Sequence, residues 1–161
     1  MCRIATRQML EVGNVGITDT EARSHFALWC ILAAPLLIGT DIATATDAAL
    51  AILGATELIA VDQDTLGFQG RVVWDSAPHG PDTARTQVYG KKMADGSVTA
   101  LLLNRGDSPA DMELNFTAVW VSGSASISLR DLWAEKDIGQ FTGSYTARAV
   151  PSHGTVVLRL R

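Results

Sequence analysis

Short apolar runs and amphipathic segments alternate through the first seventy residues. Residues 9–12 form an apolar run that predicts a strand. Behind it, Thr18-Asp19-Thr20-Glu21 has the form of a capping box, and apolar side chains then recur at helical spacing to about residue 34. Residues 35–39 are fully apolar, as is typical of a strand buried in a parallel sheet. Residues 46–53 predict a second helix that ends at Gly54 in a left-handed cap, and residues 56–61 predict a further helical turn. The order strand, helix, strand, helix indicates a parallel α/β fold.

Two such strand–helix units cannot close a fold by themselves. Two parallel strands leave both sheet edges unpaired, whereas a closed barrel of this kind contains eight units. We therefore expect a larger part of the fold upstream of this segment. Without that part, the inner faces of Leu36, Leu37 and Ile38 are expected to be exposed and the chain to self-associate.

From about Gly70 onward the pattern changes to short β-branched and aromatic runs separated by turn sequences. The last run has period two, with Val156, Leu158 and Leu160 on one face and Val157 on the other. Several short strands joined by regular turns indicate an antiparallel β-sandwich over residues 70–161. The strands are expected at residues 71–74, 87–89, 98–103, 112–116, 127–132 and 155–160.

Composition narrows the class of partner. Of the 161 residues 47% are apolar and 19% charged, and the net charge is −4 with scattered basic residues. This balance argues against nucleic acid or an anionic membrane surface as the main partner. The longest apolar stretch, residues 26–38, is too short to span a bilayer and contains Pro35. No signal-peptide pattern follows Met1, and the cellular location stays open.

The candidate chemical groups have structural interpretations that compete with functional ones. Cys2 and Cys30 cannot build a disulfide framework or a four-thiolate metal site, and Cys30 is expected to be a buried thiol. Three histidines lack metal-ligand spacing, and structural or solvent roles are favoured for them. Three tryptophans offer sugar-stacking faces, although core packing is favoured. The histidines are His25, His79 and His153, and the tryptophans are Trp74, Trp120 and Trp133.

Three aspartates lie where a catalytic role is conceivable. Asp41 follows a predicted strand, at the end where barrel enzymes have their active sites, but a loop or capping role is favoured. Asp62 and Asp64 flank Gln63 at the helix-to-sandwich junction and are expected to order that turn. The sequence Asn115-Phe116-Thr117 is a glycosylation sequon, which matters only in a secreted eukaryotic protein.

Several linked motifs resemble the α-galactosidases (melibiases), a family of glycoside hydrolases. The resemblance covers roughly residues 9–161, in order, and implies the last two βα units of a (β/α)₈ barrel in residues 1–69 followed by the sandwich in residues 70–161. The motifs that carry it are Met9-Leu10-Glu11-Val12-Gly13-Asn14, Thr18-Asp19-Thr20-Glu21, Leu28-Trp29, Ala33-Ala34-Pro35-Leu36-Leu37-Ile38-Gly39, Ile59-Ala60-Val61-Asp62-Gln63-Asp64-Thr65-Leu66-Gly67, Leu102-Leu103-Asn104-Arg105-Gly106, Arg130-Asp131-Leu132-Trp133 and residues 137–145.

The resemblance implies removal of terminal α-linked galactose with retention of configuration and without a metal or other cofactor. Retaining hydrolysis uses two carboxyl groups about 5 Å apart, and in the family both are aspartates on earlier barrel strands. No residue here carries over as catalytic. Met9 carries over as a residue that lines the galactose pocket, whereas Thr6-Arg7-Gln8 replace the family's usual Asp-Pro-Asp. Residues 1–8 are interpreted as unrelated to the family.

The first hypothesis is therefore the C-terminal fragment of an α-galactosidase-like hydrolase, inactive by itself. Its partner is an α-galactoside, and a separate chain that supplies the rest of the barrel in trans is a further possibility. The alternative is a non-catalytic β-sandwich module that binds carbohydrate or a partner protein.

Overall fold

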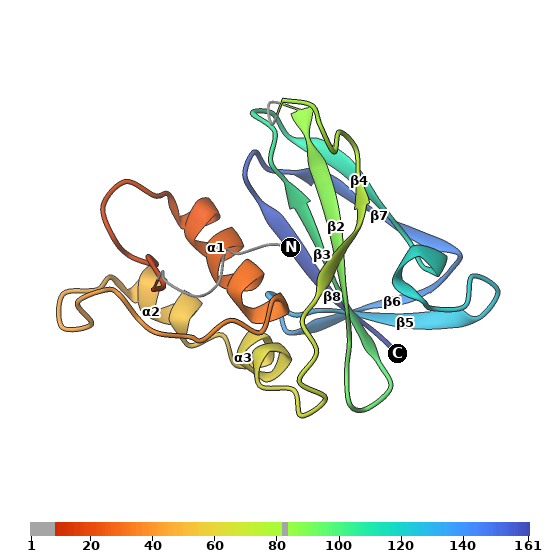
Figure 1. Ribbon diagram of the computed structural model, residues 1–161, viewed down its shortest axis with the longest axis horizontal. Helices are drawn as coiled ribbons and strands as arrows, with labels where there is room; N and C mark the ends of the chain where they lie inside the picture. The colour runs from red at the N-terminus through yellow and green to blue at the C-terminus, as the bar shows by residue number, and fades with distance from the viewer. Residues whose placement is uncertain (1–8, 82–83) are drawn as a thin grey trace.

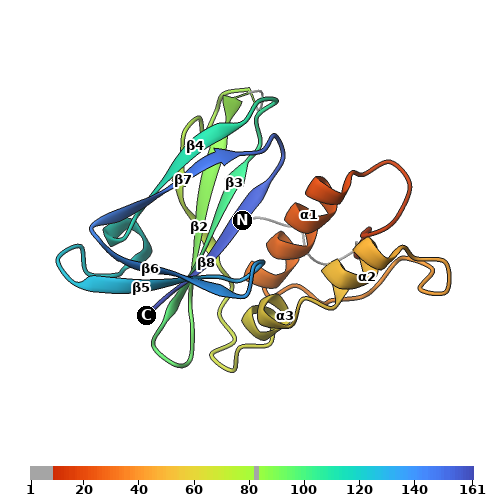
Figure 2. The same ribbon diagram turned by 180° about the vertical axis from the view of Figure 1, so that it is seen from behind.

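Three layers make up the computed structural model, which describes residues 9–81 and 84–161. A helical layer lies on one face of a six-stranded antiparallel sheet, and a two-stranded sheet lies on the other face (Figures 1 and 2). The sheet orders are β1-β2-β3-β8-β5-β6 and β4-β7. The elements are α1 (Asp19–Ile31), α2 (Asp47–Leu53), α3 (Thr56–Asp62), β1 (Arg71–Asp75), β2 (Thr86–Lys92), β3 (Val98–Asn104), β4 (Ala110–Asn115), the 3₁₀ turn η2 (Thr117–Val119), β5 (Ser126–Asp131), β6 (Lys136–Thr142), β7 (Ser144–Val150) and β8 (Thr155–Leu160).

The antiparallel sandwich predicted from the alternating pattern is confirmed, with two strands more than expected. β6 and β7 were not predicted because their sequences carry little apolar alternation. β6 lies at the sheet edge and is largely exposed, and Gly139 interrupts it. Such an edge strand is specified by its pairing with β5 rather than by burial, so its sequence gives a weak signal.

In the first half of the chain the helices are present, but the predicted strands are not continuous. Residues 9–12 and 35–39 meet in a single parallel bridge between Leu10 and Ile38. Leu10 donates its backbone N–H to the Leu37 carbonyl at 2.7 Å, and Gly39 donates to the Leu10 carbonyl at 2.9 Å. The direction of the pairing is the parallel one that the sequence pattern predicts.

Helix α1 has the predicted capping box at its start. Thr18 Oγ1 accepts a hydrogen bond from the Glu21 backbone at 3.2 Å, and the Glu21 carboxylate accepts one from the Thr18 backbone at 2.8 Å. The helix ends at Ile31, earlier than predicted, because Ala33 turns left-handed (φ 48°) and Ala34 donates back to the Trp29 carbonyl at 3.1 Å. The left-handed cap predicted at Gly54 is wrong: that residue has a φ of −93°.

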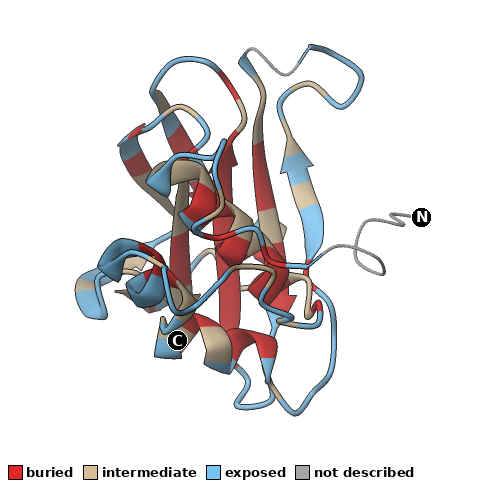
Figure 3. Ribbon diagram, turned by 90° about the vertical axis from the view of Figure 1, so that its left-hand side faces the viewer, coloured by how far each residue is buried: buried red, intermediate tan, exposed pale blue. Residues whose placement is uncertain are grey.

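The six-stranded sheet separates two hydrophobic clusters. On one face, Leu101 and Val157 pack with Phe26 and Ile31 of α1 in the first cluster. On the other face, Leu102 and its neighbours pack with β4 and β7 in the second cluster. Figure 3 shows the buried residues concentrated on the central strands between these layers. The helical segment and the sandwich therefore share one core.

A buried lysine connects the helical layer to the sheet. Lys91 of β2 is almost fully buried and donates from Nζ to the Val61 carbonyl of α3 at 2.5 Å. Burial lowers the pKa of Lys91, and the nearby Asp62 charge opposes that change. Burial also raises the pKa of Asp62, whose Oδ1 has no hydrogen-bond partner. The ammonium thus satisfies a helix-end carbonyl and partly balances a buried carboxylate.

Replacement of Lys91 by Met tests this contact. The apolar substitute keeps the packing volume but leaves the Val61 carbonyl unpaired and Asp62 uncompensated, so we expect a loss of about 3 kcal/mol in the free energy of unfolding. Lys92→Met, at the exposed end of β2 beside the Trp120 ring, is the matched control and is expected to cost less than about 1 kcal/mol. Urea unfolding followed by circular dichroism measures both. Equal midpoints for the two variants would contradict a structural role for the Lys91 ammonium.

Candidate functional site

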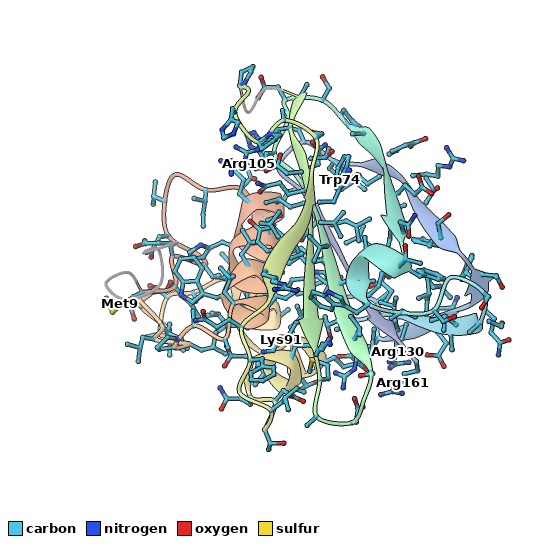
Figure 4. The ribbon with its side chains drawn as sticks, turned by 45° about the vertical axis from the view of Figure 1, so that its right-hand side comes forward. Met9, Trp74, Lys91, Arg105, Arg130 and Arg161 are labelled. Atoms are coloured by element: carbon cyan, nitrogen blue, oxygen red, sulfur yellow. The ribbon has the colours of Figure 1, made fainter. Side chains whose placement is uncertain are left out.

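Met9, the predicted substrate-binding residue, lies at an exposed edge of the helical layer. Its side chain is 51% exposed, and it stands beside Gly39, where an added Cβ would lie 3.1 Å from the Met9 Cβ and 2.9 Å from the Leu10 carbonyl oxygen. Glycine at position 39 thus allows the two parallel segments to approach. Figure 4 shows Met9 on the opposite side of α1 from the sandwich. Its role in binding a sugar stays a prediction.

Two further apolar side chains are exposed on the segment that pairs with Leu10. Leu37 is 60% exposed and Ile38 is 42% exposed, as expected for strands without neighbours. Leu36 differs from the prediction because it is partly buried against the first core cluster. We call Met9, Leu37 and Ile38 the open edge.

Two of the three candidate aspartates are held in turns, and the third, Asp62, ends helix α3. Asp41 accepts from the Ala43 backbone at 3.0 Å and from the Thr44 hydroxyl at 3.1 Å, which confirms the loop interpretation. Asp64 accepts from the Leu66 and Ala94 backbones, and so ties the junction to the β2–β3 hairpin. Asp62 is buried and accepts from the Gln63 side chain. Asp64 therefore orders the turn as predicted, whereas no contact of Asp62 reaches the turn beyond Gln63.

His25 and His153 make structural contacts, whereas His79 lies exposed in the loop between β1 and β2. His25 Nε2 accepts from the Glu11 backbone at 3.1 Å and its ring lies 4.1 Å from that of Trp29, while burial lowers its pKa. His153 Nδ1 lies 3.1 Å from a carboxylate oxygen of Glu21.

Within residues 9–81 and 84–161, no group of three His, Cys, Asp or Glu side chains is arranged to hold a metal ion. The same residues contain no helix long and apolar enough to cross a membrane. Cys30 is buried as predicted, and burial raises the pKa of its thiol.

The prediction that the sandwich tryptophans are core residues is wrong for two of the three. Trp74 is 48% exposed and Trp120 is 36% exposed, whereas Trp133 packs in part against the first core cluster. Trp74 lies on β1, an edge strand, and Trp120 follows η2 in a left-handed conformation (φ 63°). A tryptophan in a strand looks like a core residue in sequence, and only the strand order shows that this one lies at an edge.

The Trp120 indole rests on the sheet between two cations. An added Cβ at Gly90 would lie 3.1 Å from its ring, so glycine leaves the space that the indole occupies. The Arg71 guanidinium lies 4.8 Å and the Lys92 ammonium 5.3 Å from the ring centroid. The exposed part of this tryptophan is therefore flanked by positive charge.

Comparison with known proteins shows the family. The family model described as the alpha galactosidase C-terminal beta sandwich domain matches residues 83–160, and the one described as Alpha galactosidase A matches residues 3–64. The chain belongs to the α-galactosidase family. A probable α-galactosidase of Dictyostelium discoideum is 37% identical over 94% of this chain, and an α-galactosidase of Coffea arabica is 39% identical over 90%. The crystal structure of α-galactosidase I from Mortierella vinacea is similar over 95% of this chain, with 34% identity and a TM-score of 0.86.

The match is to the C-terminal portion of the family and is partial in length. The chain spans 38% of the Dictyostelium relative and 36% of the Coffea relative. The interpretation of residues 1–8 as unrelated to the family is wrong from residue 3 onward, since the family match begins there. Those eight residues lie outside the described part of the chain.

Removal of the exposed apolar side chains of the open edge tests whether this edge causes the chain to self-associate. We expect the chain to associate with itself as its concentration rises and the double variant Leu37→Ser, Ile38→Ser to remain monomeric, because about 100 Å² or more of apolar surface leaves the edge. The control is Leu66→Ser, Phe68→Ser, which removes two exposed apolar side chains elsewhere. Sedimentation velocity across a concentration series distinguishes them. A wild-type chain that stays monomeric at all concentrations would show that the edge is not adhesive.

Proposed function

We propose that this chain is the C-terminal part of a retaining glycoside hydrolase that removes terminal α-linked galactose. Family membership supports this assignment, because the named relatives are α-galactosidases. The observation that carries it within the structure is the open edge. A parallel bridge whose flanking apolar side chains are exposed is the edge at which a parallel sheet continues.

In this proposal residues 1–69 are the last two βα units of a (β/α)₈ barrel and residues 70–161 are the sandwich behind it. The parallel direction of the Leu10–Ile38 bridge and the helices that follow each segment support that division. The first core cluster then fixes the barrel wall to the sandwich. The remaining barrel units reach the open edge either from the same polypeptide or from a second chain in trans.

The 161-residue chain alone is inactive in this proposal. Retaining hydrolysis needs one carboxyl group to attack the anomeric carbon and another to protonate the leaving oxygen. The candidate carboxylates Asp41, Asp62 and Asp64 are instead held in turn and junction contacts. In the family both catalytic groups belong to earlier strands, so this chain contributes Met9 to the wall of the sugar pocket and no catalytic residue. The net charge of −4 fits a neutral sugar better than nucleic acid or an anionic membrane as partner.

Expression of this chain together with the rest of the proposed barrel tests the proposal directly. DNA sequencing upstream of the Met1 codon is expected to reveal an open frame that encodes six further βα units with two strand-end aspartates. The protein expressed from the whole frame should release nitrophenol from p-nitrophenyl α-galactoside, whereas the 161-residue chain should release none above buffer. If the upstream sequence is unrelated, the barrel part of a relative is co-expressed instead. Hydrolysis by the 161-residue chain alone, or none by the assembled protein, would refute the assignment.

Met9 is tested in that assembled, active protein. Met9→Ala removes apolar contact with the bound sugar, so we expect KM to rise about five- to tenfold with a smaller change in kcat, which corresponds to a loss of about 1–1.4 kcal/mol of binding. Leu66→Ala, an exposed apolar residue at the junction, is the control and should leave both constants unchanged. An unchanged KM in Met9→Ala would remove Met9 from the sugar pocket.

A further inference from the structure

A cleft opens at the edge of the sandwich, between β1 of the six-stranded sheet and β4 of the two-stranded sheet. Its volume is about 390 Å³, within the range of small-ligand sites. It is lined by Trp74 and Val88 on one side and by Glu113, Asn115, Thr117 and Ala118 on the other. Figure 4 shows Trp74 on the sandwich, on the far side of α1 from Met9. The cleft is therefore separate from the open edge.

Trp74 lies next to the end of β1, and hydrogen bonds hold that end of the strand in place. The next residue, Asp75, accepts from Arg85 Nη2 at 2.5 Å and from Gln87 Nε2 at 2.7 Å. The Arg85 guanidinium holds the pKa of Asp75 well below its usual range, so this pairing persists at neutral pH. Trp74 itself pairs with Val88 in the sheet register. These contacts fix the backbone position from which the exposed indole of Trp74 extends.

The opposite wall offers hydrogen-bonding groups. Asn115 Oδ1 accepts from the Thr117 backbone at 3.0 Å and from its hydroxyl at 2.7 Å. This fixes the amide so that Nδ2, a donor, is left without a partner in the described structure. The Glu113 carboxylate is exposed and likewise unpaired among the described residues. The cleft thus combines an aromatic face with one free donor and one free acceptor.

We propose that this cleft is a non-catalytic binding site for a neutral pyranose residue of a saccharide. A pyranose ring has an apolar C–H face, which suits an exposed indole, and a rim of hydroxyl groups, which suits an amide donor and a carboxylate acceptor. The inference goes beyond hydrolysis, because it assigns sugar binding to the sandwich whether or not the rest of the barrel is present.

The charge of the cleft selects a neutral sugar over an anionic one. Glu113 repels phosphate, sulfate and uronate groups, and none of the described residues that line the cleft is a cation. The surroundings of Trp120 differ in this respect, since Arg71 and Lys92 flank that ring. The two exposed tryptophans therefore make a matched pair, of which only Trp74 has the lining expected for a neutral sugar.

The experiment follows the indole N–H signals of the chain by ¹H–¹⁵N correlation NMR. The chain has four tryptophans, and the signals lost in Trp74→Ala and Trp120→Ala assign the two that matter. On addition of methyl α-galactopyranoside or methyl α-glucopyranoside we expect the Trp74 signal to shift with a dissociation constant of about 1 mM, and the Trp120 signal not to move. Inorganic phosphate is expected to leave the Trp74 signal in place.

The variants complete the test. Trp74→Ala is expected to weaken saccharide binding at least tenfold and Trp120→Ala less than twofold. Trp74→Phe, which keeps an aromatic face, should retain binding within about fivefold and serves if the alanine variant does not fold. A Trp74 signal that stays fixed at about 100 mM of both glycosides, or that responds to phosphate, would overturn the proposal. Since no hydrolysis is measured, this outcome is independent of the activity of the assembled enzyme.

Discussion

The six-stranded sheet is apolar on both faces at its centre, and this constraint organises the rest of the molecule. Every residue of β3 is buried, and its side chains alternate between two clusters. Leu102 points to the two-stranded sheet, while Leu101 meets the helical layer. A sheet of this kind needs a cover on each side. The helical segment is therefore part of the same fold as the sandwich rather than an appendage to it.

Because helices cover the sheet, some helix ends lie inside the protein. The backbone groups at those ends need hydrogen-bond partners, and the polar contacts at the junction provide them. The C-terminal carbonyls of a short helix have no partners of their own. Lys91 reaches the Val61 carbonyl from the sheet, and Asp64 binds the Ala94 backbone from the helical side. These two contacts cross the junction in opposite directions. Together with the apolar packing, they fix the orientation of the helical layer on the sheet.

The sequence predicted the parts of this arrangement that depend on local pattern. The capping box located α1, and the alternation of Val156, Leu158 and Leu160 located β8. The sequence did not predict features that depend on how the layers of the fold pack against one another. Val157, placed by the pattern on the face of β8 opposite Leu158, is buried beneath the helical layer, which the alternation alone did not predict. β6 lacks a signal because it is a polar edge strand, and Trp74 looked like core because strand order is invisible in sequence. The two unpaired strand–helix units predicted a larger part of the fold upstream, and the resemblance identified that part as a (β/α)₈ barrel, which stays a prediction.

The two exposed sides of the molecule differ in chemistry, and this difference separates their roles. At the open edge the exposed side chains of Met9, Leu37 and Ile38 are apolar, and the backbone pairs through a single bridge. Such an edge is suited to pairing with more protein, which supplies both strand partners and apolar packing. At the cleft, Trp74 faces an amide and a carboxylate. A second protein layer there would bury the Glu113 charge without a partner, whereas a hydroxylated ligand hydrogen-bonds to it and leaves it hydrated.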